Sequence, residues 1–377
     1  MRAKEETRRI VMAVTNDLVT DRRVMRHAEA LRDAGYEVLV IGRNDMELKH
    51  SRGWLFYAEY NLKLFRRLKE ESLDVVWAND TDTLLGSWLA AKGWRRSKAK
   101  LVMDAHELFP EVPEIQHKPL VKWVWRTIEH FLMPKCDALL TVCQSIADYY
   151  KKKYDVEMAV VRNVSGVTEL QGDKVTEKAS QATQSLSYSV TQPLKTLLYQ
   201  GCVNKGRGVD WAIEALEWLE DCRLVIAGGG DLLEEMKAYA AQKPWADRII
   251  FLGRLKPDDL GPLTCQASVG LVMLEDIGLS YHYALPNRIG DFVAAGVPIV
   301  VSDLPEMTAV VRKYGVGEVI EGEQLTVKGE RREARALAEA VKKVLAREWG
   351  EEDFTEARKD MDWNNEKQKL IEIIEKI

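Results

Sequence analysis

Short apolar segments alternate with helical patterns along the whole chain. In the first half, apolar and β-branched side chains form runs that predict buried strands at residues 10–15, 37–42, 74–79, 100–106 and 138–143. Further runs follow in the second half at residues 196–201, 224–228, 249–253, 269–274 and 298–302. Because strands that alternate with helices form parallel sheets covered on both faces, the pattern predicts an α/β protein with two Rossmann-like, doubly wound parallel-sheet domains.

The length and one polar segment predict where these domains divide. The chain has 377 residues, more than the size at which a single hydrophobic core usually stops growing. Residues 168–193 are rich in Ser, Thr, Gln and Lys and poor in aliphatic side chains, which is typical of a linker or an exposed excursion. We therefore expect an N-terminal domain at residues 1–167 and a C-terminal domain at residues 194–359.

The formal net charge of −5 is divided unevenly along the chain. Residues 1–165 carry +4 and the remaining residues carry −9, and an acidic chain argues against general nucleic-acid binding. Within the basic part, cations are mixed with Trp, Phe and Leu at residues 60–69, 92–100 and 118–126. Such mixtures are typical of surfaces that contact anionic lipid headgroups. In the alternative interpretation, the apolar side chains belong to the core and the cations lie on its solvated side.

The amino-terminal residues MRAKEETRRI contain no apolar core, and no apolar run approaches the roughly 18 residues of a membrane span. The sequence therefore predicts neither a signal peptide nor a spanning helix. The five cysteines include no C-x-x-C pair and fall mostly in apolar segments, as reduced core residues do. We expect a cytoplasmic protein, and the basic clusters extend this to peripheral contact with the inner face of the membrane.

The segment LPNRIGDFVAAGVPIVVS (285–302) predicts a helix whose first turn faces an anion. Gly296 fits the left-handed cap that ends such a helix, and a buried strand follows. The start of a helix carries partial positive charge, so Arg288 is disfavoured there unless an anionic ligand is present. Asp291 lies one turn beyond Asn287, where its carboxylate could accept the hydroxyl groups of a ribose. These residues predict a nucleotide diphosphate site; the alternative is an ordinary surface Arg and a solvated Asp.

Three other segments of the second half follow predicted strands. GCVNKGRG (201–208) brings Lys205 and Arg207 to the start of a helix, where they could form a second clamp on a phosphate. GGGD (228–231) permits close backbone approach, and GRL (253–255) could border a base. Because the carboxyl ends of parallel strands lie at one edge of a sheet, we expect these segments to converge. The alternative is that they are ordinary glycine-rich turns.

In the first half, His106 emerges where a strand ends, within DAHELFPE (104–111), and Glu107 follows it. A histidine among carboxylates at a strand end is a candidate functional residue, and a satisfied structural histidine is the alternative. Asp80 and Asp82 spell D-T-D, but they open a predicted helix, where acidic caps account for them. Since no D-x-D falls on a predicted donor loop, we expect no bound metal.

Several motifs, in this order, resemble those of retaining GT-B glycosyltransferases of the family-4 type, which act in capsular and envelope polysaccharide synthesis. They are ND-x-x-x-DRRVMRHAEALRDAGYEVLVIG (16–42), NDTDTL (79–84), MDAHELFPE (103–111), LLTVCQSIADYY (139–150), VVRN (160–163), LLYQGCVNKGRG (197–208) and ALPNRIGDFVAAGVPIVVS (284–302). The closing segment, DWNNEKQKLIEII (362–374), resembles the terminal helix that crosses back to the first domain in this fold, so that a C-terminal helix at residues 360–377 is expected to join that domain. The resemblance covers nearly the full length and implies two Rossmann-like domains that face a cleft.

The resemblance also implies roles for single residues. Those implied to bind the nucleotide sugar are Lys205, Arg207, Asn287 and Arg288 at the diphosphate, Asp291 at the ribose, and Arg254 and Leu255 beside the base. His106 would project toward the transferred sugar and form the catalytic set with Arg207 and Arg288, while Asn163 would lie toward the hinge. The family pattern has two glutamates eight positions apart. Here Asp291 takes the place of the second, and Tyr283 stands where the first would be.

These expectations define a glycosyltransferase that moves a sugar from a nucleotide diphosphate donor to a hydroxyl of a glycan or lipid-linked acceptor. The donor would bind the second domain and the acceptor the first. Leaving-group charge develops on the diphosphate, where fixed cations and a helix start stabilise it without a metal or a cofactor. Two alternatives stay open: a nucleotide-sugar 2-epimerase, and a non-catalytic nucleotide-sugar-binding subunit of a transferase complex.

Overall fold

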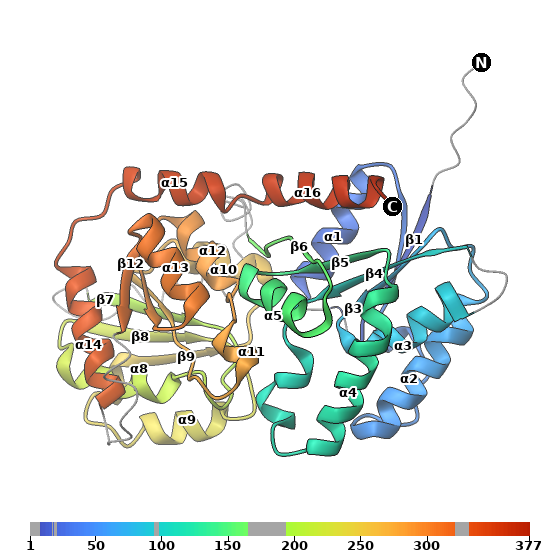
Figure 1. Ribbon diagram of the computed structural model, residues 1–377. Helices are drawn as coiled ribbons and strands as arrows, with labels where there is room; N and C mark the ends of the chain where they lie inside the picture. Colours follow the sequence, from blue (N-terminus) through green and yellow to red (C-terminus); the bar gives the residue numbers. More distant parts are fainter. Residues whose placement is uncertain (1–7, 17, 19–20, 94–97, 165–193, 321–331) are drawn as a thin grey trace. The chain divides into compact units, whose positions relative to one another are not determined.

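The computed structural model describes residues 8–16, 18, 21–93, 98–164, 194–320 and 332–377. The chain divides into two compact units (Figure 1). The first contains residues 1–163, 278–280 and 364–377, and the second contains residues 164–277 and 281–363. The expected linker, residues 168–193, lies outside the described residues.

The first unit is built around a six-stranded parallel sheet with strand order β2-β1-β3-β4-β5-β6. The strands are β1 (Arg9–Ala13), β2 (Glu37–Ile41), β3 (Val75–Asn79), β4 (Lys100–Ala105), β5 (Ala138–Thr141) and β6 (Ala159–Val160). The α-helices are α1 (Arg22–Asp33), α2 (Gly53–Leu68), α3 (Thr81–Trp88), α4 (Pro119–Leu132), α5 (Gln144–Tyr154) and α16 (Trp363–Glu375). The central strand β3 is buried along its whole length, as an apolar run covered on both faces should be.

The second unit has the same kind of sheet, with strand order β12-β11-β10-β7-β8-β9 and all pairs parallel. Its strands are β7 (Lys195–Gln200), β8 (Cys222–Ala227), β9 (Ile249–Gly253), β10 (Val269–Val272), β11 (Ile299–Ser302) and β12 (Gly317–Ile320). The remaining helices are α8 (Val209–Ala215), α9 (Leu233–Ala240), α10 (Pro257–Thr264), α11 (Leu279–His282), α12 (Arg288–Ala295), α13 (Pro305–Tyr314), α14 (Arg332–Leu345) and α15 (Glu352–Asp360).

The predicted α/β class with two doubly wound parallel sheets is confirmed. All ten predicted strands are present within one or two residues of their expected bounds. Two strands are additional, β6 and β12, and both lie at sheet edges. They are short and only partly buried, so their sequences lack the continuous apolar run that marks the other strands.

The closing helix α16 is fastened to the first unit by a buried carboxylate. Glu366 is fully buried and accepts hydrogen bonds from the Arg162 backbone N at 2.9 Å and from Arg162 Nε at 2.8 Å. Leu370 and Ile374 of the same helix are also fully buried. The last turns of the chain therefore complete the core of the unit that its first residues begin.

Across the part of the chain that the structure describes, every helix is too short or too polar to cross a bilayer.

Candidate functional site

The carboxyl ends of four neighbouring strands of the second unit form one edge. β10, β7, β8 and β9 lie side by side and parallel, so the segments that follow them emerge together. The expected convergence of residues 201–208, 228–231 and 253–255 is therefore confirmed. A Cβ atom added to Gly229 would lie 3.6 Å from the Arg254 Cβ, which shows how closely the second and third segments approach.

Arg288 places a buried cation at this edge. It is the first residue of α12 and is 7% exposed. Its Nη1 donates to the Gln200 carbonyl at 3.0 Å, its Nη2 donates to the Met273 carbonyl at 3.2 Å, and its Cζ lies 5.0 Å from the centroid of the Tyr199 ring. These carbonyls at the ends of β7 and β10 hold the guanidinium at the helix start, while its Nε is buried without a hydrogen-bond partner among the described residues. Among the described residues, no carboxylate forms an ion pair with this guanidinium.

The backbone around this guanidinium leaves no room for additional side-chain atoms. Gly201 has a φ of +145°, and a Cβ at that position would lie 2.4 Å from Arg288 Nη1. A Cβ on Gly228 would lie 1.7 Å from the Gly201 carbonyl oxygen. Glycines at the ends of β7 and β8 therefore allow the two strands and the guanidinium to approach one another.

Arg207 supplies a second cation to the same region. Its Cζ lies 4.7 Å from the centroid of the Tyr281 ring, and its Nε is buried without a hydrogen-bond partner among the described residues. Burial lowers the pKa of Arg288, and the charge of Arg207 lowers it further. Two guanidinium groups that repel each other, with no ion-paired carboxylate among the described residues, are suited to an anionic ligand. Lys205 is exposed in the same segment.

Asp291 lies in the first turn of α12, where its backbone N donates to the Asn287 carbonyl at 3.3 Å. Its carboxylate is 6% exposed and accepts a hydrogen bond from Gln200 Nε2 at 3.2 Å. Thr264 donates in turn to Gln200 Oε1 at 3.0 Å, which fixes the orientation of the amide. Asn287 is exposed and occupies the N-cap position of α12, where its side chain makes no capping hydrogen bond. The ribose contact of Asp291 stays a prediction, and the surroundings of this carboxylate leave only a small part of it open.

The remaining sequence-predicted residues of the second unit lie beyond β9 and before α12. Arg254 is exposed and Leu255 is half-buried against the apolar core, directly after the carboxyl end of β9. Tyr283 is half-buried two residues before Leu285. Their expected contacts with a base or a sugar stay predictions.

In the first unit, Asp104 organises a buried charge cluster at the end of β4. Its carboxylate accepts from Arg23 Nε at 2.9 Å and from Arg23 Nη2 at 2.6 Å, and both side chains are almost fully buried. Although burial favours the neutral acid, Arg23 and His106 hold the pKa of Asp104 well below its usual range. Burial and the charge of Arg23 lower the pKa of the neighbouring His27 to about 4, so that this histidine is neutral.

His106 lies between two carboxylates. Its Nδ1 is 3.4 Å from Asp80 Oδ2 and its Nε2 is 3.5 Å from Asp104 Oδ2, and the side chain is 19% exposed. Burial lowers the pKa of His106, but Asp80 and Asp104 outweigh it and raise this pKa to about 9. His106 is therefore an imidazolium cation at neutral pH. It belongs to the first unit, where Asp80 and Asp104 flank its ring.

Asp80 and Asp82 are not the helix caps that the sequence favours. Asp80 occupies the N-cap position of α3 but makes no side-chain capping bond; its Oδ1 accepts from the His106 backbone N at 2.8 Å. Its φ of +60° is a conformation that non-glycine residues rarely adopt. The bond from the Asp80 backbone N to the Asp104 carbonyl, at 2.9 Å, holds it in place. The hydrogen bonds that tie Asp80 to the charge cluster therefore take the place of a side-chain cap on α3.

Asp82 points inward from the first turn of α3. It is 5% exposed, and its Oδ2 accepts from Thr15 Oγ1 at 2.6 Å. Burial, followed by the charge of Asp80, raises the pKa of Asp82 to about 8. Sequence reasoning missed this role because nothing in the local pattern shows that α3 turns this carboxyl toward β1.

The high pKa of Asp82 leads to a stability prediction: Asp82→Asn is expected to stabilise the protein at neutral and alkaline pH. The ordinary pKa of this carboxyl is 3.8, so Asp82 ionises at a lower pH in the unfolded chain than in the folded protein. The folded protein therefore loses stability as the pH rises. The destabilisation begins above about pH 3.8 and is complete above about pH 8, and an amide avoids it. Unfolding midpoints of the variant and the wild type should diverge as the pH rises. The exposed Asp247→Asn serves as the control, and a difference that is constant with pH would contradict the prediction.

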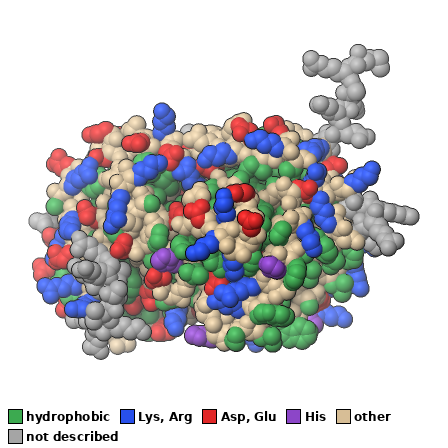
Figure 2. Space-filling view, viewed as in Figure 1, with side chains coloured by type: hydrophobic (Ala, Val, Ile, Leu, Met, Phe, Trp, Pro, Cys, Tyr) green, Lys and Arg blue, Asp and Glu red, His purple; other side chains and the backbone are tan. Residues whose placement is uncertain are grey.

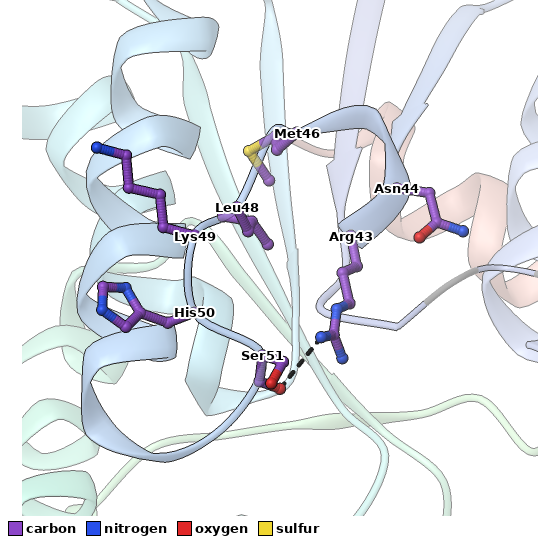
Figure 3. Close-up of a pocket in the computed structure, with 7 residues that line it drawn as sticks. All are labelled: Arg43, Asn44, Met46, Leu48, Lys49, His50 and Ser51. Carbon is purple, nitrogen blue, oxygen red and sulfur yellow. Dashed lines mark hydrogen bonds between the residues drawn. The ribbon is translucent and has the colours of Figure 1, made fainter.

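The sequence also gave no sign of a shallow pocket of about 240 Å³ after β2, lined by Arg43, Asn44, Met46, Leu48, Lys49, His50 and Ser51 (Figure 3). Arg43 Nη2 donates to the Ser51 carbonyl at 3.1 Å across one side of it. His50 Nδ1 lies 2.8 Å from Glu59 Oε2 of α2. None of the sequence-predicted site residues lines this pocket. Separately, in the described parts of the chain, no group of three or more His, Cys, Asp or Glu side chains is arranged to hold a metal.

Comparison with known proteins covers both units. Residues 20–164 match the family model described as Glycosyltransferase Family 4, and residues 194–347 match the model described as Glycosyl transferases group 1. An uncharacterised glycosyltransferase of Methanocaldococcus jannaschii is 26% identical over 190 residues, which make up 48% of this chain and 44% of that protein. This match therefore spans less than half the length of that relative.

Solved structures with similar folds align over nearly the whole chain. Sucrose-phosphate synthase from Thermosynechococcus elongatus has a TM-score of 0.74 at 14% identity and covers 98% of each chain. HepE of Anabaena in complex with UDP-glucose has a TM-score of 0.73 at 13% identity and covers 98% of this chain and 100% of its own. WaaG, a glycosyltransferase involved in lipopolysaccharide biosynthesis, has a TM-score of 0.71 at 17% identity, with 97% and 99% covered. At these identities the likeness establishes the shared GT-B fold.

Proposed function

Because the chain belongs to the glycosyltransferases, with a family 4 domain followed by a group 1 domain, we propose that it transfers a sugar from a nucleotide diphosphate donor to an acceptor hydroxyl. The observation that carries this proposal is Arg288, a buried guanidinium that has carbonyl and ring contacts but no balancing carboxylate among the described residues. A diphosphate supplies the missing negative charge. The related fold of HepE, solved with UDP-glucose, supports a donor of this class.

Three elements of the second unit would act on the diphosphate. Arg288 and Arg207 donate charge-assisted hydrogen bonds to its oxygens, and the first turn of α12 adds its unpaired backbone N–H groups. Negative charge on the diphosphate grows as the bond to the sugar breaks, so that these fixed cations stabilise the transition state more than the bound donor. We propose that this arrangement works without a metal and without a further cofactor.

His106 is the proposed contribution of the first unit. As a cation fixed by Asp80 and Asp104, it can donate a hydrogen bond to a sugar oxygen or stabilise charge that develops during transfer. We propose further that transfer proceeds with retention and that the acceptor is a glycan or a lipid-linked glycan of the cell envelope, reached at the inner face of the membrane. The similarity of fold to WaaG, which is involved in lipopolysaccharide biosynthesis, supports an envelope acceptor.

The proposal is tested first by donor binding. Thermal unfolding in the presence of UDP, GDP, ADP and CMP sugars should show one class that raises the midpoint, because a ligand bound only by the folded state stabilises it. The selected donor is then incubated with acceptor extracts. Sugar transfer supports the proposal, whereas epimer formation without an acceptor, or tight binding without any turnover, would replace it with an epimerase or a non-catalytic binding subunit.

Arg207→Ala is expected to weaken binding of the selected nucleoside diphosphate by about 1.5–3 kcal/mol, the usual contribution of a hydrogen bond to a charged group. The half-buried Arg207 makes no ion pair among the described residues, so its loss should leave the unfolding midpoint nearly unchanged. Calorimetric titration measures the affinity, with the exposed Lys343→Ala on α14 as the control. Equal affinity in the Arg207 variant and the control would remove Arg207 from the site.

A further inference from the structure

Exposed apolar side chains gather on three helices of the first unit. Of the nine large apolar side chains that are exposed among the described residues, eight belong to α2, α3 and α4. The most exposed are Trp54 at 74%, Leu120 at 72%, Trp123 at 63% and Phe131 at 58%. Figure 2 shows hydrophobic side chains gathered over α2 and α4 at the lower edge of the view, beside Lys and Arg side chains. We call the outer faces of these three helices the apolar surface.

The three helices form one layer, so that their outer faces are neighbours. α3 packs against both α2 and α4. Asn61 of α2 donates to the Asp82 carbonyl at 2.7 Å and accepts from the Gly86 backbone N at 2.8 Å, both on α3. The rings of Tyr57 on α2 and Trp125 on α4 lie 5.0 Å apart between centroids. The exposed side chains of α2 and α4 therefore belong to a single continuous layer.

The apolar surface is separate from the core of the unit. α2 buries Phe56, Tyr60 and Leu64, and α4 buries Trp125 and Leu132, so that the inward faces of both helices are already filled. Among the described residues, α2 and α4 thus each carry one buried apolar face and a second apolar face that is exposed. The basic and aromatic clusters at residues 60–69 and 118–126 accordingly contain both core residues and exposed ones.

The apolar surface is strongly cationic at its margins. Residues 52–69 contain five Lys and Arg and one Glu, and residues 118–135 contain four and one. Lys63 pairs with Glu59, and Lys122 and Arg126 pair with the buried Glu111. Arg66 and Lys118 are exposed and form no ion pair among the described residues. A second copy of the chain, seated face to face on this surface, would set these cations against one another.

We infer that the apolar surface docks on an anionic lipid bilayer. Trp54 and Trp123 are suited to the boundary between headgroups and acyl chains, where an indole buries its ring and keeps its N–H wet. Leu120 and Phe131 lie on the same helix as Trp123 and enter the acyl boundary beside it, while the surrounding cations pair with lipid phosphates. This inference deepens the proposed function, because it names the surface at which a lipid-linked acceptor is met.

The test is flotation of the full chain with vesicles of phosphatidylcholine containing about 30% phosphatidylglycerol, an anionic content sufficient to attract basic surfaces. The wild type should float with these vesicles and remain largely in solution with pure phosphatidylcholine. Leu120→Ser/Trp123→Ser and, separately, Arg66→Glu/Lys118→Glu should each lower the partition coefficient by at least about tenfold. Salt at about 0.5 M should weaken the binding of the wild type, because it screens the cations.

A matched charge reversal on the second unit, Lys195→Glu/Lys343→Glu, changes the net charge by the same amount on exposed residues and should leave flotation unchanged. All substituted residues are exposed, so the variants should keep the unfolding midpoint and the response to the selected nucleotide sugar of the wild type. If no nucleotide sugar raises the unfolding midpoint of the wild type, the proposed function is contradicted, while the flotation result still supports docking on the bilayer.

Two outcomes would overturn the inference. One is that the wild type stays in solution with anionic vesicles, or that both doubly substituted variants float as well as the wild type does. The other is a dimer detected by light scattering that Leu120→Ser/Trp123→Ser dissociates, since the apolar surface would then be occupied by a second copy.

Discussion

An Arg288→Met variant is expected to lose the nucleotide diphosphate without losing stability. Arg288 is buried, burial lowers its pKa, and Arg207 repels it, so the cation is held in the fold at a cost. Methionine fills a similar volume, and removal of the buried, repelled charge offsets the loss of the donor to the Gln200 and Met273 carbonyls, so we expect an unfolding midpoint close to that of the wild type. Transfer should fall on the order of 10²–10³-fold, as it does when a fixed donor to a developing anion is removed.

Arg248 provides a control of the same chemical type in the same unit. Its Nη1 donates to the Leu219 carbonyl at 2.5 Å and to the Cys222 carbonyl at 2.8 Å, and its Nη2 donates to the Leu216 carbonyl at 2.8 Å. Arg248→Met leaves these carbonyls without a donor, and it should lower the midpoint while the affinity for the nucleotide is kept. Calorimetry and thermal unfolding of the two variants therefore give opposite patterns. A lower midpoint with unchanged affinity in Arg288→Met would mark Arg288 as a structural residue.

His106→Ala is expected to reduce transfer on the order of 10²-fold or more, while nucleotide diphosphate binding stays close to that of the wild type. The carboxylates of Asp80 and Asp104 raise the pKa of His106 to about 9, so the cation is present at neutral pH and its contribution to transfer should decline as the pH rises through about 9. The variant should lack this limb of the pH profile. His50→Ala, an exposed histidine of the same unit, serves as the control.

The same pKa gives a stability signature. A histidine whose pKa is raised from 6.5 to about 9 in the fold stabilises it fully below about pH 6.5, and this contribution is lost as the pH rises through about 9. The difference in unfolding midpoint between the wild type and His106→Ala should therefore be larger at about pH 6 than at about pH 10. Collapse of the fold in the variant at every pH, with loss of nucleotide binding, would contradict a catalytic role and support a purely structural one.

The sheets and the start of α12 could be predicted from sequence because their signals are local. An apolar run between turns marks a strand, and Arg288 stands where a helix start is readable from its neighbours. The contacts of Arg288 were not readable, because the Gln200 and Met273 carbonyls meet it only once β7 and β10 are aligned. From the sequence, the charge of Arg288 was therefore explained by a ligand alone, although backbone carbonyls also stabilise it.

The charge cluster of the first unit could not be predicted from the sequence, for a related reason. Arg23 and Asp104 are 81 positions apart, and their pairing depends on where α1 crosses the end of β4. One signal was present: Asp104 interrupts the apolar run of β4, and a carboxylate in a buried strand requires a partner. Sequence alone could not name that partner or show that the Asp80 carboxylate at the N-cap position would bond to the cluster and not to the first turn of α3.

The attachment of α16 has a consequence for how this polypeptide is made. Arg162 and Glu366 are 204 positions apart, and the first unit buries Leu370 and Ile374 from the closing helix. During translation, most of the first unit emerges long before α16, the helix that completes its core. By the time α16 is synthesised, the second unit has been made in full. The second unit is therefore synthesised in full before the first, and a nascent chain stopped short of residue 366 would leave the core of the first unit exposed to chaperones and proteases.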